Sequence, residues 1–134
     1  MDRHGDMRAL DHGQPALLLC KPHEMLGRFG EKWTYLTVIL LAQADAWVRS
    51  SDIKAGIYGI SQRMLTVTLR NLERDGFVDR RVYPEVPPRV EYRLTPLAQD
   101  MMPALKTFTR WIDANWSGIE TAREAYDDRR SRID

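Results

Sequence analysis

The stretch that decides the fold runs from Gly59 to Leu97 and reads GISQRMLTVTLRNLERDGFVDRRVYPEVPPRVEYRLTPL. Its first half predicts an amphipathic helix, because Ser61 is a good N-cap residue and Gly76 stands where a helix ends in a left-handed residue. Between them, leucines recur at helical spacing, at Leu65, Leu69 and Leu72. This helix follows a shorter predicted helix and a short turn, which is the pattern of a helix-turn-helix motif.

The face of this helix opposite the leucines is rich in arginine. At about 100° of rotation per residue, Arg63, Arg70 and Arg74 fall on one side. Such a face can simply be solvated, but a planar guanidinium can also grip phosphate or pair with guanine through two hydrogen bonds. Residues near the N-terminus of a recognition helix usually reach the bases first. We expect Gln62, Arg63 and Thr66 to approach base edges and Val67 to touch a thymine methyl. Arg70 and Arg74 are expected nearer the DNA backbone, and Ser61 is a further expected DNA contact.

Two β-prone runs after this helix predict a hairpin. They are Phe77–Tyr83 and Arg89–Leu94, and the PEVPP loop between them keeps its prolines at the tip, since proline cannot donate to a strand ladder. From Ile60 to Thr95 there are seven arginines and five acidic residues, so the local excess of positive charge is modest. Affinity for DNA should therefore depend on pairing two such domains. The arginines expected to reach DNA from this wing are Arg80, Arg81 and Arg89.

The segments upstream predict further helices. We expect a short helix over about residues 22–29 and a core helix over residues 32–44, apolar around most of its circumference. Trp47 and Val48 could form a short strand, and Ser50 is expected to cap a brief helix ended by Gly56. The predicted fold class is mainly α with a small β-hairpin: a winged helix-turn-helix with extra N- and C-terminal dimerisation helices.

A long amphipathic helix is predicted after the hairpin. Thr95 supplies a hydroxyl N-cap, Pro96 suits the first helical position, and Pro103 should kink the helix or mark its first-turn boundary. A helix from Pro96 to about Ile119 spans roughly 35 Å, longer than a small winged core can cover. Its apolar stripe can be domain core or a two-fold interface, and the length favours the interface. The residues expected there are Leu105, Phe108, Trp111, Ile112 and Trp116.

The length of 134 residues and the net charge of +1 fit one globular domain that is not strongly basic overall. We expect a mobile arm over residues 1–15, the winged domain with its dimerisation helices over residues 16–120, and a charged tail or helix over residues 121–134. No apolar run approaches the roughly 18–20 residues of a membrane-spanning helix, and the N-terminus lacks the apolar core of a secretory signal. A cytoplasmic protein without membrane contact is therefore expected.

Cys20 is the single cysteine, so an internal disulfide is excluded. Cys20 and His23 are too few for a metal site, and neither a metal nor a cofactor is expected. The thiol can be an inert small hydrophobe, or a sensor of a small electrophile or oxidant, because Lys21 and a nearby helix N-terminus both favour the thiolate. The sequence contains no spacing typical of a catalytic set, so an enzyme is not expected.

Three features together resemble the HxlR-type family of winged-helix regulators: FGEKWTYLTVILL at residues 29–41, the segment from Gly59 to Leu97, and the isolated cysteine upstream. The resemblance implies a cytoplasmic bacterial homodimer whose N- and C-terminal helices form the dimer. Such a dimer binds an inverted repeat in double-stranded DNA near promoters.

In several members of that family a cysteine before the first helix senses electrophiles or oxidants, and Cys20 occupies the matching place. The sequence departs from the family pattern at Lys21, where proline often follows the cysteine, and at Glu31, which replaces one of two glycines. The predicted function is a transcriptional regulator, repressor or activator. The alternative is a winged-helix module that binds another protein and has no specific DNA binding.

Overall fold

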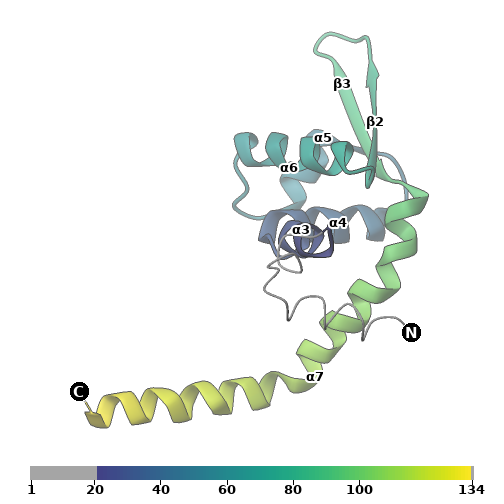
Figure 1. The fold of residues 1–134 in the computed structure, drawn as a ribbon. Coiled ribbons are helices and arrows are strands. Elements are labelled where there is room, and N and C mark those ends of the chain that lie inside the picture. The colour runs from purple at the N-terminus through teal and green to yellow at the C-terminus, as the bar shows by residue number, and fades with distance from the viewer. Residues whose placement is uncertain (1–20, 134) are drawn as a thin grey trace, which may run out of the picture. The chain divides into compact units, whose positions relative to one another are not determined.

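The computed structural model describes residues 21–133, which fall into two units (Figure 1). The first unit ends at Thr95, and the second begins at Pro96 and consists of one long helix. The fold is mainly α-helical with a small antiparallel sheet, as the sequence predicts. In chain order the elements are α3 (Lys21–Phe29), α4 (Lys32–Ala44), β1 (Val48–Arg49), α5 (Ser50–Gly56), α6 (Gln62–Arg74), β2 (Val78–Tyr83), β3 (Arg89–Leu94) and α7 (Pro96–Ile133).

Helix α6 begins and ends as its sequence predicts. Ser61 is the N-cap, and its hydroxyl accepts a hydrogen bond of 3.1 Å from the Met64 N–H. At the other end Gly76 has φ 84°, a left-handed conformation that glycine adopts without steric cost. The Phe77 N–H then donates to the Leu72 carbonyl and closes the last turn. The chain therefore leaves α6 directly into the hairpin.

The core of the first unit lies where α4, α5 and α6 meet the sheet. The buried face of α4 is narrower than its apolar pattern predicts. Two of its four buried residues are threonines, and the apolar Leu36 is exposed. The buried Thr37 hydroxyl donates a hydrogen bond to the Trp33 carbonyl one turn earlier. The fully buried apolar side chains are Val38, Leu41, Ile53, Leu65 and Leu72.

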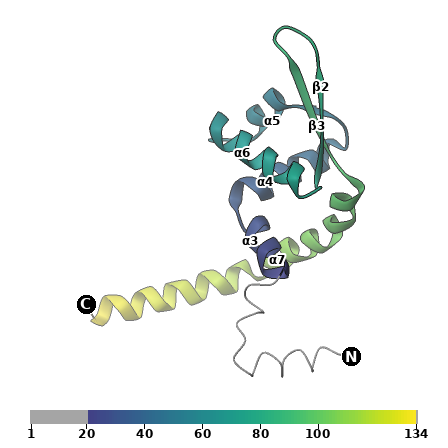
Figure 2. The same ribbon diagram turned by 45° about the horizontal axis from the view of Figure 1, so that its top comes forward.

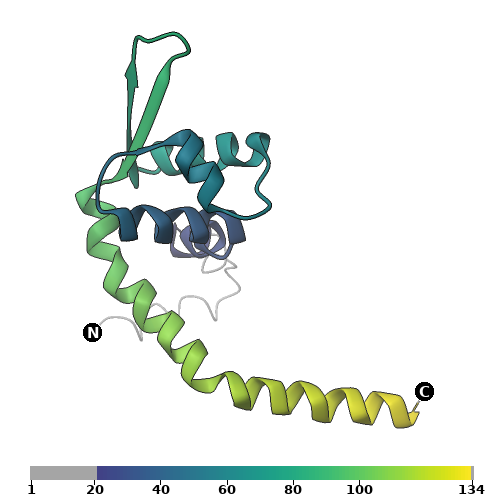
Figure 3. The same ribbon diagram turned by 180° about the vertical axis from the view of Figure 1, so that it is seen from behind.

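The sheet has the strand order β1-β3-β2, with both pairings antiparallel. β2 and β3 form the predicted hairpin, which projects away from the helices of the first unit in Figures 1, 2 and 3. The short strand predicted from Trp47 and Val48 is shifted by one residue: β1 is Val48–Arg49, Trp47 precedes it, and Val48 lies opposite Tyr92 of β3. Tyr92 and Leu94 are buried, so the base of the hairpin belongs to the core.

The structure corrects two helix boundaries. Ser50 is the first residue of α5, and the N-cap is Arg49, which makes no side-chain cap hydrogen bond. Arg49 is still paired with Glu91 in the sheet, so the helix starts directly from the strand. Likewise α7 continues well past Ile119 to Ile133, and its 38 residues span about 57 Å. Pro103 lies inside α7 and does not mark its first-turn boundary.

Helix α7 extends further than predicted because residues 119–133 contain no proline or glycine and are rich in good helix formers. The segment expected as a charged tail or helix is thus the last part of this helix. The expected mobile arm over residues 1–15 and Cys20 lie outside the residues that the structure describes. Within residues 21–133, no helix is long and apolar enough to cross a membrane.

Candidate nucleic-acid interface

Helix α6 presents the two opposite faces that its sequence predicts. Leu65, Leu69 and Leu72 are buried, whereas Val67 is 37% exposed. Within residues 21–133, no salt bridge involves any of the three arginines of the outer face. The face therefore carries three guanidinium groups without a salt-bridge partner among the described residues. Besides Val67, the exposed residues of this face are Ser61, Gln62, Arg63, Thr66, Arg70 and Arg74.

Two side chains of the first turn of α6 are tied to each other. The Thr66 hydroxyl donates to the Gln62 carbonyl at 2.9 Å, and the Gln62 amide nitrogen donates to the Thr66 hydroxyl at 3.3 Å. Both side chains are thus partly oriented before any ligand arrives. Arg63, between them in the sequence, has no such restraint among the described residues.

Asp75 ends α6 and could have neutralised an arginine of that helix. It pairs instead with Arg28 of α3, whose Nε donates to the Asp75 carboxylate at 2.7 Å in a partly buried contact. Beside it, the rings of Phe29 and Phe77 meet edge to face at 5.1 Å. Helix α3 is therefore fixed to the point where α6 passes into the wing, and Asp75 is paired with α3 and not with an arginine of α6.

One face of the hairpin carries a stack of alternating arginine and aromatic side chains, which we call the wing stack. Arg81 lies between two rings, 4.1 Å from Trp47 and 5.1 Å from Tyr83, measured from the guanidinium carbon to the ring centroid. Arg93 lies 4.6 Å from Trp47, and Arg89 lies 3.9 Å from Tyr83. Such cation–π contacts favour a fixed guanidinium position. The wing stack therefore runs in the order Arg93, Trp47, Arg81, Tyr83, Arg89.

The arginines of the wing stack are also paired with carboxylates. Arg81 lies 2.9 Å from Glu91, and Arg89 lies 3.4 Å from Glu85 and 3.6 Å from Glu91. Arg93 lies 3.8 Å from Asp79. The antiparallel register explains the pairs, since Arg81 is directly opposite Glu91, and Asp79 opposite Arg93. The charges of the predicted wing contacts Arg81 and Arg89 are thus largely compensated within the hairpin.

Arg80 differs from the other two predicted wing contacts. It lies on the opposite face of the hairpin, in register with Tyr92, and its side chain is exposed. Among the described residues it takes part in no salt bridge. From the sequence, Arg80 and Arg81 are expected to act alike, and Trp47 is expected only in a strand. Nothing in the sequence brings Trp47 to Arg81, because the contact depends on the register of β1 with β3.

The predicted interface residues of α7 share one side of the helix. Phe108, Trp111 and Trp116 are 61%, 56% and 41% exposed, while Leu105 and Ile112 are half-buried. Tyr126 and Ile133 lie on the same side and are also exposed. They are not among the predicted interface residues, because the predicted helix ends near Ile119. The helix therefore carries an extended apolar stripe of the kind that usually marks an interaction surface.

A match to the HxlR-like helix-turn-helix family covers residues 28–120, which include α4, α5, α6 and the wing. The chain belongs to this family. YtfH of Escherichia coli (strain K12), an uncharacterised HTH-type transcriptional regulator, is 37% identical over 105 residues, or 78% of this chain and 82% of YtfH. The family resemblance read from the sequence is confirmed.

Solved structures of the same class are similar to this fold. The putative transcriptional regulator ytfH from Salmonella typhimurium has a TM-score of 0.68 and 36% identity, covering 78% of this chain and 92% of that one. The redox regulator HypR in its reduced form has a TM-score of 0.64 and 35% identity, covering 76% and 99%. This HxlR-type protein is thus a DNA-binding transcriptional regulator of the winged helix-turn-helix type, and its relatives form a non-enzymatic class.

Proposed function

We propose that this regulator acts in the cytoplasm by binding an inverted-repeat operator in double-stranded DNA as a homodimer, with α6 of each protomer in a major groove. The main support for this proposal is the arginine content and exposure of the outer face of α6. Arg63, Arg70 and Arg74 are exposed there without a salt bridge among the described residues, while the opposite face is buried. Arg63 would address guanine from the first turn, and Arg70 and Arg74 would hold the DNA backbone. Ser61, Gln62, Thr66 and Val67 would complete the contacts of the first turns.

The homodimer is proposed from the exposed stripe of α7. Large aromatic side chains such as Phe108 and Trp111 are costly to leave in water and form the anchors of many interfaces. A two-fold axis would place two copies of α6 on half-sites about one helical turn apart, or a multiple of that. The modest positive charge of one wing and one α6 is then enough for operator binding, because two linked domains bind the DNA together.

Arg80 should be the main DNA contact of the wing. We expect Arg80→Ala to reduce the slope of log affinity against log salt concentration by about one per protomer, because one phosphate contact is lost. Arg81→Ala is the matched control: Glu91 already compensates the Arg81 charge, so the slope should change much less. The measurement is a series of fluorescence anisotropy titrations at increasing salt. A loss of slope for Arg81→Ala equal to that of Arg80→Ala would contradict this assignment of the wing.

Control by the thiol of Cys20 is also proposed. The similar protein HypR is a redox regulator, solved in reduced and oxidised forms, and the residue after Cys20 begins α3, which contacts the end of α6 through Arg28 and Asp75. Diamide is therefore expected to change the operator affinity of the wild-type protein but not of Cys20→Ser, measured by gel shift before and after treatment. The same response in both proteins would remove the thiol from the mechanism.

The operator can be found by selecting genomic fragments with the purified protein. Recovery of an inverted repeat supports the proposal and identifies the regulated promoter, where reporter assays would separate repression from activation. Recovery of no DNA, even at low salt, would favour the second candidate function, a winged-helix module that binds another protein through α7.

A further inference from the structure

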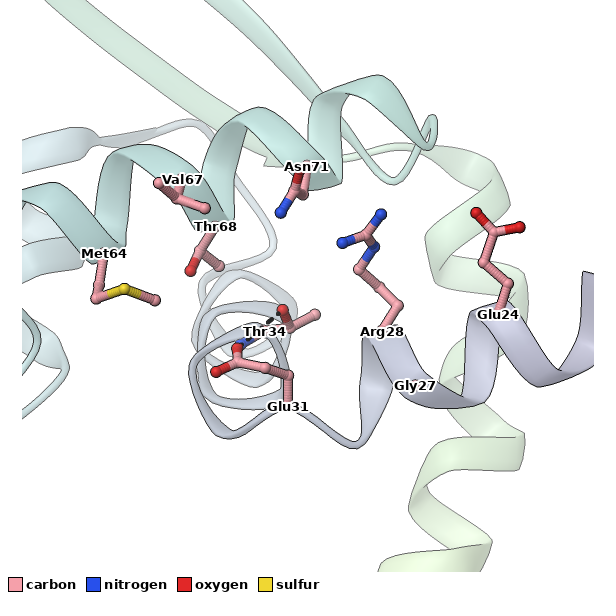
Figure 4. A pocket seen from close by; sticks show the side chains of 9 residues that line it. All are labelled: Glu24, Gly27, Arg28, Glu31, Thr34, Met64, Val67, Thr68 and Asn71. Carbon is pink, nitrogen blue, oxygen red and sulfur yellow. Dashed lines mark hydrogen bonds between the residues drawn. The ribbon is translucent and has the colours of Figure 1, made fainter.

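A cavity of about 380 Å³ lies in the first unit between α3, the start of α4 and α6 (Figure 4). Its volume falls within the roughly 300–1,000 Å³ of small-molecule sites. We propose that it binds a small organic cation, a primary amine with an apolar body, and that the bound cation strengthens DNA binding by α6. The second half of this inference rests on the proposed function, whereas the first half does not.

The charge of the lining favours a cation. Glu24 of α3 and Glu31 before α4 both line the cavity, and neither takes part in a salt bridge within residues 21–133. Arg28 lines it as well, but its guanidinium is already paired with Asp75 at 2.7 Å. Two carboxylates are thus left without a compensating charge. They attract an amine and disfavour phosphates and carboxylates.

Thr68 is a second, independent sign of a ligand. Its side chain belongs to α6, is only 2% exposed and lines the cavity. Figure 4 shows its hydroxyl directed across the cavity toward Thr34 and Glu31. The hydroxyls of Thr37 and Thr66 donate to the carbonyl one turn earlier, but the Thr68 hydroxyl has no hydrogen-bond partner among the described residues. The side chain is held in place by burial while its hydroxyl faces the cavity, so this hydroxyl is suited to a ligand there.

The donors of a primary ammonium match the acceptors around the cavity. Such a group has three N–H donors. Glu31 uses its Oε1 atom to accept from the Thr34 N–H, at 3.2 Å, and its other carboxylate oxygen remains for a ligand. This oxygen and the Thr68 hydroxyl supply two acceptors on one side of Arg28, and Glu24 adds a negative charge on the other side. Quaternary ammonium ions lack these donors and are expected to bind less well.

Two of the residues that α6 contributes to the cavity, Met64 and Val67, are apolar, and this side of the cavity adjoins the proposed DNA surface. Met64 and Val67 would contact the body of the amine, which gives an organic cation an advantage over a metal ion. Val67 also borders the arginine face of α6. A cation bound here adds positive charge beside the helix that meets DNA, so DNA affinity should rise by about threefold. By linkage, DNA raises the affinity for the cation by the same factor.

The binding test uses calorimetry on the full chain without DNA, with three indole compounds that differ in charge. Tryptamine is expected to bind about tenfold more tightly than the neutral analogue tryptophol, because its hydrogen bonds are charge-assisted, and the anion indole-3-acetate should not bind. Glu31→Gln, which keeps the cap acceptor, and Thr68→Val should each reduce tryptamine affinity, while Glu120→Gln on α7 should not. Equal binding of the three compounds, or no binding of tryptamine, would overturn the proposal.

The coupling test measures operator affinity by anisotropy with and without tryptamine. We expect tighter DNA binding in the wild type and no response in Glu31→Gln, which also controls for tryptamine binding to DNA itself. An unchanged DNA affinity at saturating tryptamine would overturn the coupling. Absence of DNA binding under both conditions would instead overturn the proposed function and leave the calorimetric result standing.

Discussion

Replacing Arg63 with alanine is expected to weaken operator binding by about 1–3 kcal/mol for each half-site, or roughly 5- to 150-fold per half-site. Arg63 lies in the first turn of α6, where side chains reach base edges, and its guanidinium has no partner among residues 21–133. The variant should lose discrimination at one base pair of each half-site, because a bidentate contact to guanine reads sequence. Anisotropy titrations against operators changed one base pair at a time measure both effects.

The matched control for Arg63→Ala is Arg110→Ala, which removes an exposed arginine from α7. It should leave operator affinity within about twofold, since surface substitutions away from a site cost little. Both variants should melt at the wild-type temperature, because neither arginine contributes to the core. If Arg63→Ala binds every operator as the wild type does, α6 does not read DNA through this residue.

A double substitution on α7, Phe108→Glu with Trp116→Glu, is expected to convert the proposed homodimer to a monomer. Each change places a carboxylate on the apolar stripe, where a two-fold interface would bury it without a partner. Operator affinity should then fall by at least about 100-fold, because linked binding of two domains is lost. Sedimentation velocity gives the oligomeric state, and titration of the operator gives the affinity.

The control for this experiment adds the same two negative charges elsewhere on α7, through Ala114→Glu with Ser117→Glu. Both residues are exposed and lie on the side of the helix away from Phe108, so the added carboxylates should not meet the interface. This control variant should remain a dimer with normal operator affinity. If the Phe108 and Trp116 double variant also stays dimeric, α7 does not form the interface through these residues.

The features that the sequence predicts well are those encoded within a few residues. The N-cap hydrogen bond of Ser61, the left-handed Gly76 and the buried leucines of α6 depend on contacts one or two turns apart. The hairpin follows in the same way from two β-prone runs and a proline-rich tip. Together these local signals were enough to predict the fold class and the exposed arginine face.

The features that the sequence did not predict depend on partners far apart in the chain. Arg28 pairs with Asp75, and Trp47 contacts Arg81 and Arg93, only after helices and strands have packed. The first contact occupies the carboxylate at the end of α6, and the other two fix the positions of wing arginines. The unpartnered Thr68 hydroxyl is a further case, because Thr66 two residues earlier has the same chemistry but bonds to its own helix. No local pattern separates the two.

Binding of an inverted repeat by α6 of a homodimer can be tested by titrating the selected operator and a scrambled duplex side by side at several salt concentrations. We expect two protomers per duplex and an operator affinity at least about 1,000-fold above that of the scrambled duplex. The expected salt slope is about −4 to −6, because each protomer makes three backbone contacts. Equal affinity for the two duplexes, or no binding at the lowest salt concentration, would show that the protein does not read an inverted repeat.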